Sequence, residues 1–205
     1  KAVVFDMDGL LVHTERQWLE AKIELCRRYD HQLDDTDKAA VFGSADSESA
    51  KYFTQVFGLG EDRVEDIREE YMDIVGRLID TGVEVTDGAA ELIEQLRRQV
   101  PIGLASNTRR SLVDRVLAQT PFAGSFVAIT TGDEVPPKPA PDVYLTACRR
   151  IGAEPATAVA VEDSPTGVRA ARAAGLTCIG VPSDPAHPLI EADHQVAALT
   201  ELLQA

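Results

Sequence analysis

The sequence predicts an α/β fold: a doubly wound parallel sheet with a helical domain inserted after the first strand. Short apolar runs recur along the chain, and each has the length and composition of a strand buried on both faces. Amphipathic stretches with helical periodicity separate the later runs, which is the alternation that βα units produce. A long helical stretch separates the first run from the second, and this spacing predicts the insert.

The expected elements follow one another in a regular order. The strands are expected at the apolar runs 2–5, 102–105, 126–129, 158–161 and 178–181. The helices between the later strands are expected at the amphipathic stretches 89–99, 109–118, 142–151 and 166–174. Ligands of such sheets bind at the carboxyl ends of the strands, so the chemistry is expected in the residues that directly follow each run.

The insert begins near Thr14 and ends near Val85, and it contains no convincing strand. We expect an all-helical domain that leaves the sheet at the carboxyl end of the first strand and covers the site like a lid. The predicted domains are a sheet domain, residues 1–13 and 84–205, and a helical insert, residues 14–83. Asp87 is a candidate N-cap for the helix that follows the insert.

The composition is globular and strongly acidic. The 205 residues carry a formal net charge of −14, with 44% hydrophobic and 26% charged residues, which suits a chain that buries an ordinary core. This charge repels phosphate backbones and anionic headgroups, so neither nucleic acid nor a membrane is an expected partner. A small phosphate ester can still bind if local cations and main-chain N–H groups overcome this field, and this requirement indicates a metal ion.

The cysteines and the apolar runs predict a protein of a reducing compartment. Cys26, Cys148 and Cys178 are odd in number and form no Cys-x-x-Cys pair, so we expect buried free thiols. No apolar run is long enough to cross a bilayer, and residues 1–5 are too short for the core of a signal peptide. The expected location is the cytoplasm, and the plain expectation for the assembly is a monomer.

The first candidate site follows the first predicted strand, at Asp6-Met7-Asp8-Gly9. Alternation along an extended chain puts Asp6 and Asp8 on the same side, and Gly9 permits a sharp turn. Two neighbouring carboxylates repel each other unless a cation neutralises one of them or they share a proton. A plain turn or a helix cap is the alternative, because Asp and Gly are common in turns.

Glu162 and Asp163 follow the fourth predicted strand. Because the carboxyl ends of parallel strands meet at one edge of a sheet, we expect these acids to converge with Asp6 and Asp8. Four hard oxygen donors without an accompanying His or Cys suit Mg²⁺ rather than zinc or copper. An N-cap at Asp163 or Ser164 is the alternative, but it does not account for two adjacent acids after a buried strand.

Two further segments at the same edge are candidates for binding an anion. Ser106 and Asn107 follow the second strand and precede a helix, where a hydroxyl, an amide and main-chain N–H groups make an anion site. Lys138 lies between two prolines, which restrict its backbone and can direct its ammonium group inward. A plain N-cap and a solvated surface lysine are the alternatives.

Together these segments resemble the haloacid dehalogenase-like phosphohydrolases, and the resemblance spans the whole chain. The insert resembles the helical cap of the subgroup that contains β-phosphoglucomutase, phosphoglycolate phosphatases and sugar-phosphate phosphatases. The resemblance implies a Rossmann-like catalytic core with a helical cap. The matching motifs are Asp6-Met7-Asp8-Gly9-Leu10-Leu11, Ser106-Asn107-Thr108, Lys138-Pro139-Ala140-Pro141-Asp142 and Glu162-Asp163-Ser164-Pro165-Thr166-Gly167.

The resemblance also implies the roles of these residues. Asp6 attacks phosphorus and forms an aspartyl-phosphate, and Asp8 protonates the leaving oxygen and then deprotonates the attacking water. Lys138 is counted with them in the catalytic set. Ser106, Asn107 and Lys138 are the implied groups that hold the phosphoryl oxygens. The implied ligands of Mg²⁺ are the Asp6 carboxylate, the Asp8 main-chain carbonyl and the Asp163 carboxylate, with Glu162 as direct or water-mediated support.

Three positions bear on the choice of reaction within the family. Asp8 argues against a dehalogenase, because a leaving halide needs no proton. His13 stands where many relatives carry Asp or Asn, and we interpret it as a tolerated hinge residue rather than a proton relay or a substrate contact. Asp46 stands in the loop 41–46 where phosphoglucomutases place an arginine for a second phosphate. The other histidines, His31, His187 and His194, are expected at the surface.

The expected function is therefore a magnesium-dependent phosphatase that hydrolyses a small phosphate ester such as a sugar phosphate. One alternative is a phosphomutase similar to β-phosphoglucomutase, which uses the same aspartyl-phosphate. A less favoured alternative is a non-enzymatic module that responds to phosphate or to phosphorylation of an Asp. Such receiver-like modules share an acidic pocket and a lysine, but they lack a helical insert.

Overall fold

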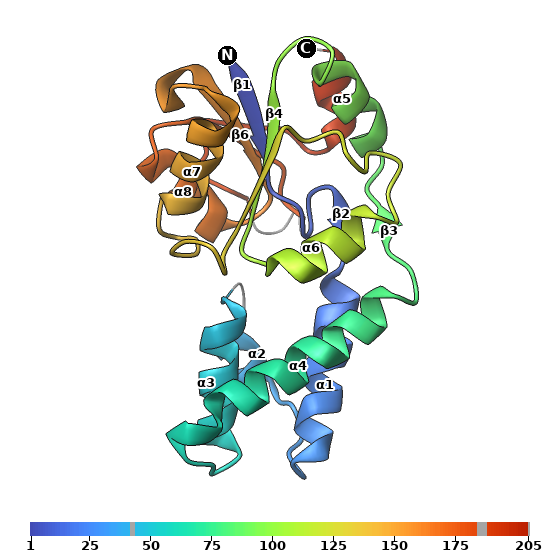
Figure 1. Cartoon of the computed structure of the whole chain (residues 1–205), viewed down its shortest axis with the longest axis vertical. Coiled ribbons are helices and arrows are strands. Elements are labelled where there is room, and N and C mark those ends of the chain that lie inside the picture. Colours follow the sequence, from blue (N-terminus) through green and yellow to red (C-terminus); the bar gives the residue numbers. More distant parts are fainter. Residues whose placement is uncertain (42–43, 184–187, 205) are drawn as a thin grey trace. The chain divides into compact units, whose positions relative to one another are not determined.

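The computed structural model describes residues 1–41, 44–183 and 188–204, and the α/β class is confirmed (Figure 1). A six-stranded sheet has the order β5-β4-β1-β6-β7-β8, and its neighbouring strands run parallel. The strands are β1 (Ala2–Phe5), β4 (Ile102–Ser106), β5 (Ala128–Thr131), β6 (Ala158–Glu162), β7 (Thr177–Gly180) and β8 (His194–Gln195).

Amphipathic helices connect the successive strands from β4 to β7. Apolar side chains of α7 and α8, among them Val143 and Val168, are buried in one core with Val4 of β1. Burial of such faces, more than helix propensity, stabilises helices of this length. The helical elements are α5 (Ala89–Leu96), α6 (Arg110–Leu117), α7 (Asp142–Ile151) and α8 (Pro165–Ala173), with the 3₁₀ helices η2 (Pro155–Thr157) and η3 (Leu199–Gln204).

The strand order reverses at β1. The chain adds β4 and β5 on one side of β1, and then returns to add β6, β7 and β8 on the other side. Val4 and Phe5 have no exposed surface because β1 is central in the sheet. The ligand crevice of a doubly wound sheet lies at this reversal, outside the carboxyl ends of the strands. The functional site is therefore expected at the residues that follow β1 and β6.

Some elements differ from the sequence-based expectation. Two two-residue strands, β2 (Val12–His13) and β3 (Glu84–Val85), form an antiparallel ribbon, and β8 was not expected either. Strands this short show no alternation that a sequence can reveal. β5 begins at Ala128, after the exposed Val127 and later than the apolar run, and two β-branched threonines complete the strand.

The chain divides into two compact units, Lys1–His13 with Val83–Ala205, and Thr14–Gly82. In the second unit the long helix α4 packs against α1 and α3, with Ile74 and Val75 buried on its inner face. Residues 42 and 43 of the 41–46 loop lie outside the described part of the chain. The elements of this unit are α1 (Glu15–Arg28), α2 (Asp35–Ala40), α3 (Asp46–Val56), η1 (Glu61–Arg63) and α4 (Val64–Ile79).

A buried carboxylate, Asp37, organises the helical unit. Asp37 Oδ2 lies 2.7 Å from His31 Nε2 and accepts a hydrogen bond from the Asp34 main chain at 3.0 Å. Asp37 Oδ1 accepts from the Tyr52 hydroxyl at 2.8 Å. Asp34 caps α2 in return, through its side chain and the Asp37 N–H. His31 was expected at the surface; its side chain is partly exposed, and its ring also contacts this buried carboxylate.

The other sequence expectations for isolated residues have mixed outcomes. Cys26, Cys148 and Cys178 are buried free thiols, as expected. His194 is exposed, while His187 lies outside the described residues. None of the described helices combines the length and the apolarity that crossing a bilayer requires.

Candidate active site

The end of β1 places Asp6 at the reversal of strand order. The main-chain N–H of Asp6 donates to the Val161 carbonyl at 3.0 Å, which ties the residue after β1 to β6. The Asp6 residue is 7% exposed. Glu162 is the last residue of β6, and Asp163 follows it. Acids from two neighbouring strands therefore meet at the carboxyl edge of the sheet.

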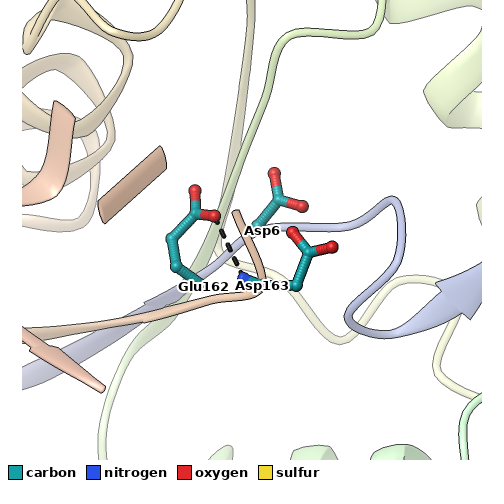
Figure 2. Close-up of side chains that lie close together, drawn as sticks. All are labelled: Asp6, Glu162 and Asp163. Atoms are coloured by element: carbon teal, nitrogen blue, oxygen red, sulfur yellow. Dashed lines mark hydrogen bonds between the residues drawn. The ribbon is translucent and has the colours of Figure 1, made fainter. Parts of the chain in front are cut away.

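Asp6, Glu162 and Asp163 form a compact group of carboxylates (Figure 2). Each contributes one oxygen, and these oxygens all lie within 4.8 Å of one another. The dashed line in Figure 2 marks the hydrogen bond from the Asp163 N–H to Glu162 Oε2, at 3.2 Å. Carboxylates this close repel one another in a buried site. Oxygen donors of this kind and spacing fit a hard divalent cation.

Lys138 supplies positive charge to this group from the loop before α7. Its Nζ donates to Asp6 Oδ1 at 2.5 Å and to Glu162 Oε1 at 2.6 Å, and the residue is 6% exposed. Burial alone would lower the pKa of Lys138, but Asp6 and Glu162 together raise it above its ordinary value. The ammonium group therefore stays charged inside the site.

The charge of Lys138 does not balance the acids around it. Burial, which has the largest effect, together with Glu162 and Asp8 raises the pKa of Asp6 to about 8, against the opposing effect of Lys138. A shift in this direction means that the ionised form of Asp6 is disfavoured without more positive charge. The site therefore favours binding of a cation beside Asp6.

Glu162 is held by donors from three segments. It has no exposed surface, and its Oε1 accepts from the Tyr144 hydroxyl at 2.6 Å as well as from Lys138. Its Oε2 accepts from the Ser164 hydroxyl at 3.2 Å. Burial raises the pKa of Tyr144 well above its ordinary value, and Glu162 adds to this shift, so the phenol stays protonated and donates. Glu162 is thus a fixed acceptor for the Lys138 ammonium group.

The segment after β4 orients Asp8. Asp8 Oδ2 accepts hydrogen bonds from Thr108 Oγ1 at 2.8 Å and from Ser106 Oγ at 3.3 Å. Ser106 Oγ in turn accepts from the Thr108 N–H at 3.0 Å. The hydroxyl that was expected to meet an anion therefore also positions the second aspartate of the first motif.

Asn107 holds the main chain of Lys138 on both sides. Its Oδ1 accepts from the Lys138 N–H at 2.7 Å, and its Nδ2 donates to the Lys138 carbonyl at 3.2 Å. Gly132, just after β5, lets the chain pass close to Asn107, because a Cβ atom at position 132 would lie 2.7 Å from the Asn107 carbonyl oxygen. The lysine loop and the segment after β4 are therefore packed as one piece.

Thr108 and Tyr144 contact the site, and the sequence reasoning assigned them no role. A signal for Tyr144 exists, because a tyrosine on the buried face of a helix needs a partner for its hydroxyl. A signal for Thr108 is its hydroxyl two residues beyond Ser106, at the edge where ligands are expected. Neither signal names the partner, which depends on how the side chains of distant segments point.

The structure brings all the expected site residues to the carboxyl edge of the sheet, and it describes two other candidates by their neighbours within their own units. His13 lies on β2, where it is exposed and faces Glu84 across the ribbon. Asp46 lies in the helical unit, where it accepts a hydrogen bond from Arg68 Nε at 3.0 Å. The residues at the edge are Asp6, Asp8, Ser106, Asn107, Lys138, Glu162 and Asp163.

Comparisons with known proteins find relatives in sequence and in structure. A family model described as haloacid dehalogenase-like hydrolase matches residues 1–175. The chain is 32% identical to validoxylamine A 7'-phosphate phosphatase of Streptomyces hygroscopicus subsp. limoneus, over 98% of this chain and 95% of that protein. It is 29% identical to hexitol phosphatase B of Escherichia coli K12, over 98% of this chain and 93% of that protein. The crystal structure of CbbY from Rhodobacter sphaeroides in complex with phosphate is similar, with a TM-score of 0.86, 28% identity, and coverage of 98% of this chain and 95% of that one.

Proposed function

Because the chain belongs to the haloacid dehalogenase-like hydrolase family, we propose that it is a magnesium-dependent phosphatase that uses Asp6 as a covalent nucleophile. The observation that carries this proposal is the compact group of Asp6, Glu162 and Asp163, with Lys138 bound to Asp6. A group of carboxylates binds a negatively charged phosphoryl group only when cations lie between them. Magnesium and one lysine supply that charge.

In the first step a carboxylate oxygen of Asp6 attacks phosphorus, and the bond from phosphorus to the ester oxygen breaks. Asp8 donates its proton to the leaving oxygen, which departs as an alcohol. The hydrogen bonds from Thr108 and Ser106 to Asp8 Oδ2 support this role, because they hold the carboxyl group in one orientation. The products of the step are an aspartyl-phosphate on Asp6 and an ionised Asp8.

In the second step Asp8 removes a proton from a water molecule, whose oxygen attacks the same phosphorus atom. The bond from phosphorus to the Asp6 oxygen breaks, inorganic phosphate leaves, and the Asp6 carboxylate is restored. Asp8 is again protonated and ready for another ester. One group therefore serves as acid and then as base.

The Asp6 and Asp163 carboxylates and the main-chain carbonyl of Asp8 would hold the Mg²⁺ ion. When bound, the ion would neutralise charge that develops on the phosphoryl oxygens. Both oxygens of Glu162 accept hydrogen bonds from protein donors, which favours support through water and through Lys138 over direct ligation. The carboxylate donor set, without His or Cys, fits magnesium better than zinc.

We propose that the Lys138 ammonium group and the Ser106 hydroxyl bind the phosphoryl oxygens. Lys138 stays charged and already contacts the nucleophile. The Asn107 side chain bonds the main chain of Lys138 through both its oxygen and its nitrogen. This contact favours a role for the Asn107 side chain in holding the lysine loop. The Asn107 backbone would then lie beside the phosphoryl group.

The proposed substrate is a small phosphomonoester such as a sugar phosphate, and the proposed selector is the helical unit, residues 14–83, acting as a cap on the core of residues 1–13 and 84–205. The names of two relatives, a validoxylamine A 7'-phosphate phosphatase and a hexitol phosphatase, support this class. In the cap, Asp46 pairs with Arg68, which gives no support to a second phosphate site of the mutase kind.

Phosphate release from p-nitrophenyl phosphate, with and without Mg²⁺, tests the proposal. The wild-type protein should release phosphate when Mg²⁺ is present, and Asp6→Asn should release none. Intact turnover by Asp6→Asn would refute the assignment of the nucleophile. A mutase would instead need a sugar bisphosphate for activation and would release little phosphate.

Asp8→Asn tests the two-step chemistry separately. Because p-nitrophenolate leaves without a proton, this variant should still be phosphorylated but should hydrolyse the intermediate slowly. We expect one burst of p-nitrophenolate, followed by a stall, with phosphate found by mass spectrometry on the peptide that carries Asp6. Steady turnover without a burst would contradict the role of Asp8 as the base.

A further inference from the structure

Gly167 occupies a position at which a helix ordinarily favours another residue. It lies inside α8 (Pro165–Ala173), is buried, and donates its N–H to the capping Ser164 hydroxyl at 3.1 Å. Its backbone does not adopt the left-handed conformation that glycine is needed for. Alanine is the better helix former at such a position. The glycine therefore needs a reason outside the helix.

The reason is the carboxylate of Glu162. A Cβ atom at position 167 would lie 1.9 Å from Glu162 Cδ, 1.9 Å from Oε1 and 2.0 Å from Oε2. These separations are far inside van der Waals contact, so a side chain and the observed Glu162 carboxylate exclude each other. The carboxylate occupies the space that any larger residue at position 167 would fill.

The Glu162 carboxylate cannot move out of this space without losing its hydrogen bond from Lys138. Its Oε1 accepts from Lys138 at 2.6 Å and from Tyr144 at 2.6 Å, and its Oε2 faces the start of α8. The residue has no exposed surface into which the carboxylate can turn. A displaced carboxylate therefore leaves the Lys138 ammonium group with one of its two acceptors.

We infer that Gly167 is a positioning residue, which sets the Lys138 ammonium group by leaving room for Glu162. This inference rests on the proposed function, in which Lys138 acts on the phosphoryl group. Gly167 has no side chain that can react, and the atoms that a Cβ at this position would meet belong to Glu162, so its effect passes through Glu162. It follows that the effect of a side chain at position 167 depends on the length of the side chain at position 162.

A double-mutant cycle tests this dependence. Gly167→Ala should lower kcat/KM for p-nitrophenyl phosphate about 100-fold, the loss expected when a reacting group is misplaced by roughly 1 Å. Glu162→Asp withdraws the carboxylate by one methylene, so the atoms that would clash are absent. In that background Gly167→Ala should change kcat/KM by less than about 2-fold. An equal loss in both backgrounds would overturn the inference.

Gly103→Ala is the matched control. Gly103 lies in β4 of the same unit, and a Cβ atom there would meet its nearest neighbours at 3.5 Å, an ordinary contact. Its kcat/KM should stay close to that of the wild type. If Gly167→Ala does not fold, the double variant with Glu162→Asp must fold, because the collision is gone. Failure of both to fold would also overturn the inference.

A crystal structure of Gly167→Ala separates this inference from the proposed function. We expect the residue-162 carboxylate to have moved out of hydrogen-bonding distance of Lys138 Nζ, whatever the activity. A carboxylate still 2.6 Å from the ammonium nitrogen, as in the wild type, would overturn the inference even for an active phosphatase. Absence of phosphate release by the wild type would instead refute the proposed function.

Discussion

Two buried carboxylate clusters, one in each unit, use similar donors to different ends. In the helical unit Asp37 accepts from the Tyr52 hydroxyl and the Asp34 main chain and contacts His31. In the sheet unit Glu162 accepts from the Tyr144 hydroxyl and from Lys138, but Asp6 and Asp163 stand beside it. In the first cluster the donors surround the carboxylate of Asp37, whereas the second brings the carboxylates of Asp6, Glu162 and Asp163 close together.

The difference appears in the pKa values. Burial alone would raise the pKa of Asp37, but the hydrogen bonds from Asp34, His31 and Tyr52 lower it below its ordinary value. The pKa of Asp6 is raised to about 8, despite Lys138. A carboxylate whose donors match its charge stabilises a fold, whereas acids in excess of their donors create a demand for a cation. The comparison separates a structural acid from a functional one.

The largest effect is expected from Asp6→Asn. Phosphate release should fall at least about 10⁴-fold, as when a covalent nucleophile is removed, while Asp37→Asn should retain turnover. The same substitution should also change how thermal stability depends on pH when a chelator is present. A carboxyl group whose pKa is raised from 3.8 to about 8 on folding loses its stabilising contribution as pH rises through that range.

Thermal unfolding with EDTA between pH 5 and about 8.5 measures this contribution. The midpoint of the wild-type protein should fall as pH rises, and the midpoint of Asp6→Asn should fall less. If the midpoints of the two proteins changed equally with pH, the carboxyl group with the raised pKa would not be that of Asp6.

Lys138→Met should have the next largest effect. It leaves Asp6 and Glu162 buried without their shared donor, and breaking such a pair destabilises a protein by about 3 kcal/mol. Urea unfolding in the absence of Mg²⁺ measures the loss. Lys51→Met, at an exposed lysine of α3, is the control and should leave the unfolding free energy unchanged. Equal stability of the two variants would contradict the account of the lysine.

Asp37→Asn should destabilise the helical unit by about 2 kcal/mol at pH 7, because it removes a charged acceptor of buried hydrogen bonds. A lowered pKa stabilises the fold above the ordinary value of 3.8, and this contribution is lost as pH falls through the folded-state pKa. The gap between wild type and variant should therefore close below pH 3.8. Trp18, the single tryptophan of the chain, lies in this unit and reports its unfolding by fluorescence. A gap that persists at low pH would argue against the charge of Asp37 as its cause.

The smallest effect is expected from Gly132→Ala. The added Cβ would press on the Asn107 backbone, which shifts the amide that holds the Lys138 main chain. We expect kcat/KM to fall about 10-fold, less than for a residue that meets the Glu162 carboxylate. The same assay with Gly103→Ala gives the baseline for an alanine in this sheet. If kcat/KM of Gly132→Ala equalled that of Gly103→Ala, the contact between the Asn107 amide and the Lys138 main chain would tolerate this shift.

The sequence predicts the parts of this molecule that follow from period and topology. β1 and α7 begin and end where their patterns predict them, because each pattern is unbroken. The convergence of Asp6 and Asp163 is predictable because parallel strands bring their carboxyl ends to one edge, whatever the distance along the chain.

The parts that the sequence does not predict are the partners of individual side chains. The hydrogen bonds from Tyr144 to Glu162 and from Asn107 to Lys138 depend on how side chains from separate segments point. The half-buried His31 is a similar case, since its polar surroundings in the sequence favour the surface. Periodicity places a residue on a face, but only packing decides which group it meets.

Calorimetric titration with Mg²⁺ tests the central claim most directly, because the claim is that excess acid at the sheet edge binds a cation. The wild-type protein should bind one ion, Asp163→Asn should bind it at least about 10-fold more weakly, and Asp37→Asn should bind it like the wild type. Unchanged affinity in Asp163→Asn, or an equal loss in Asp37→Asn, would contradict the account.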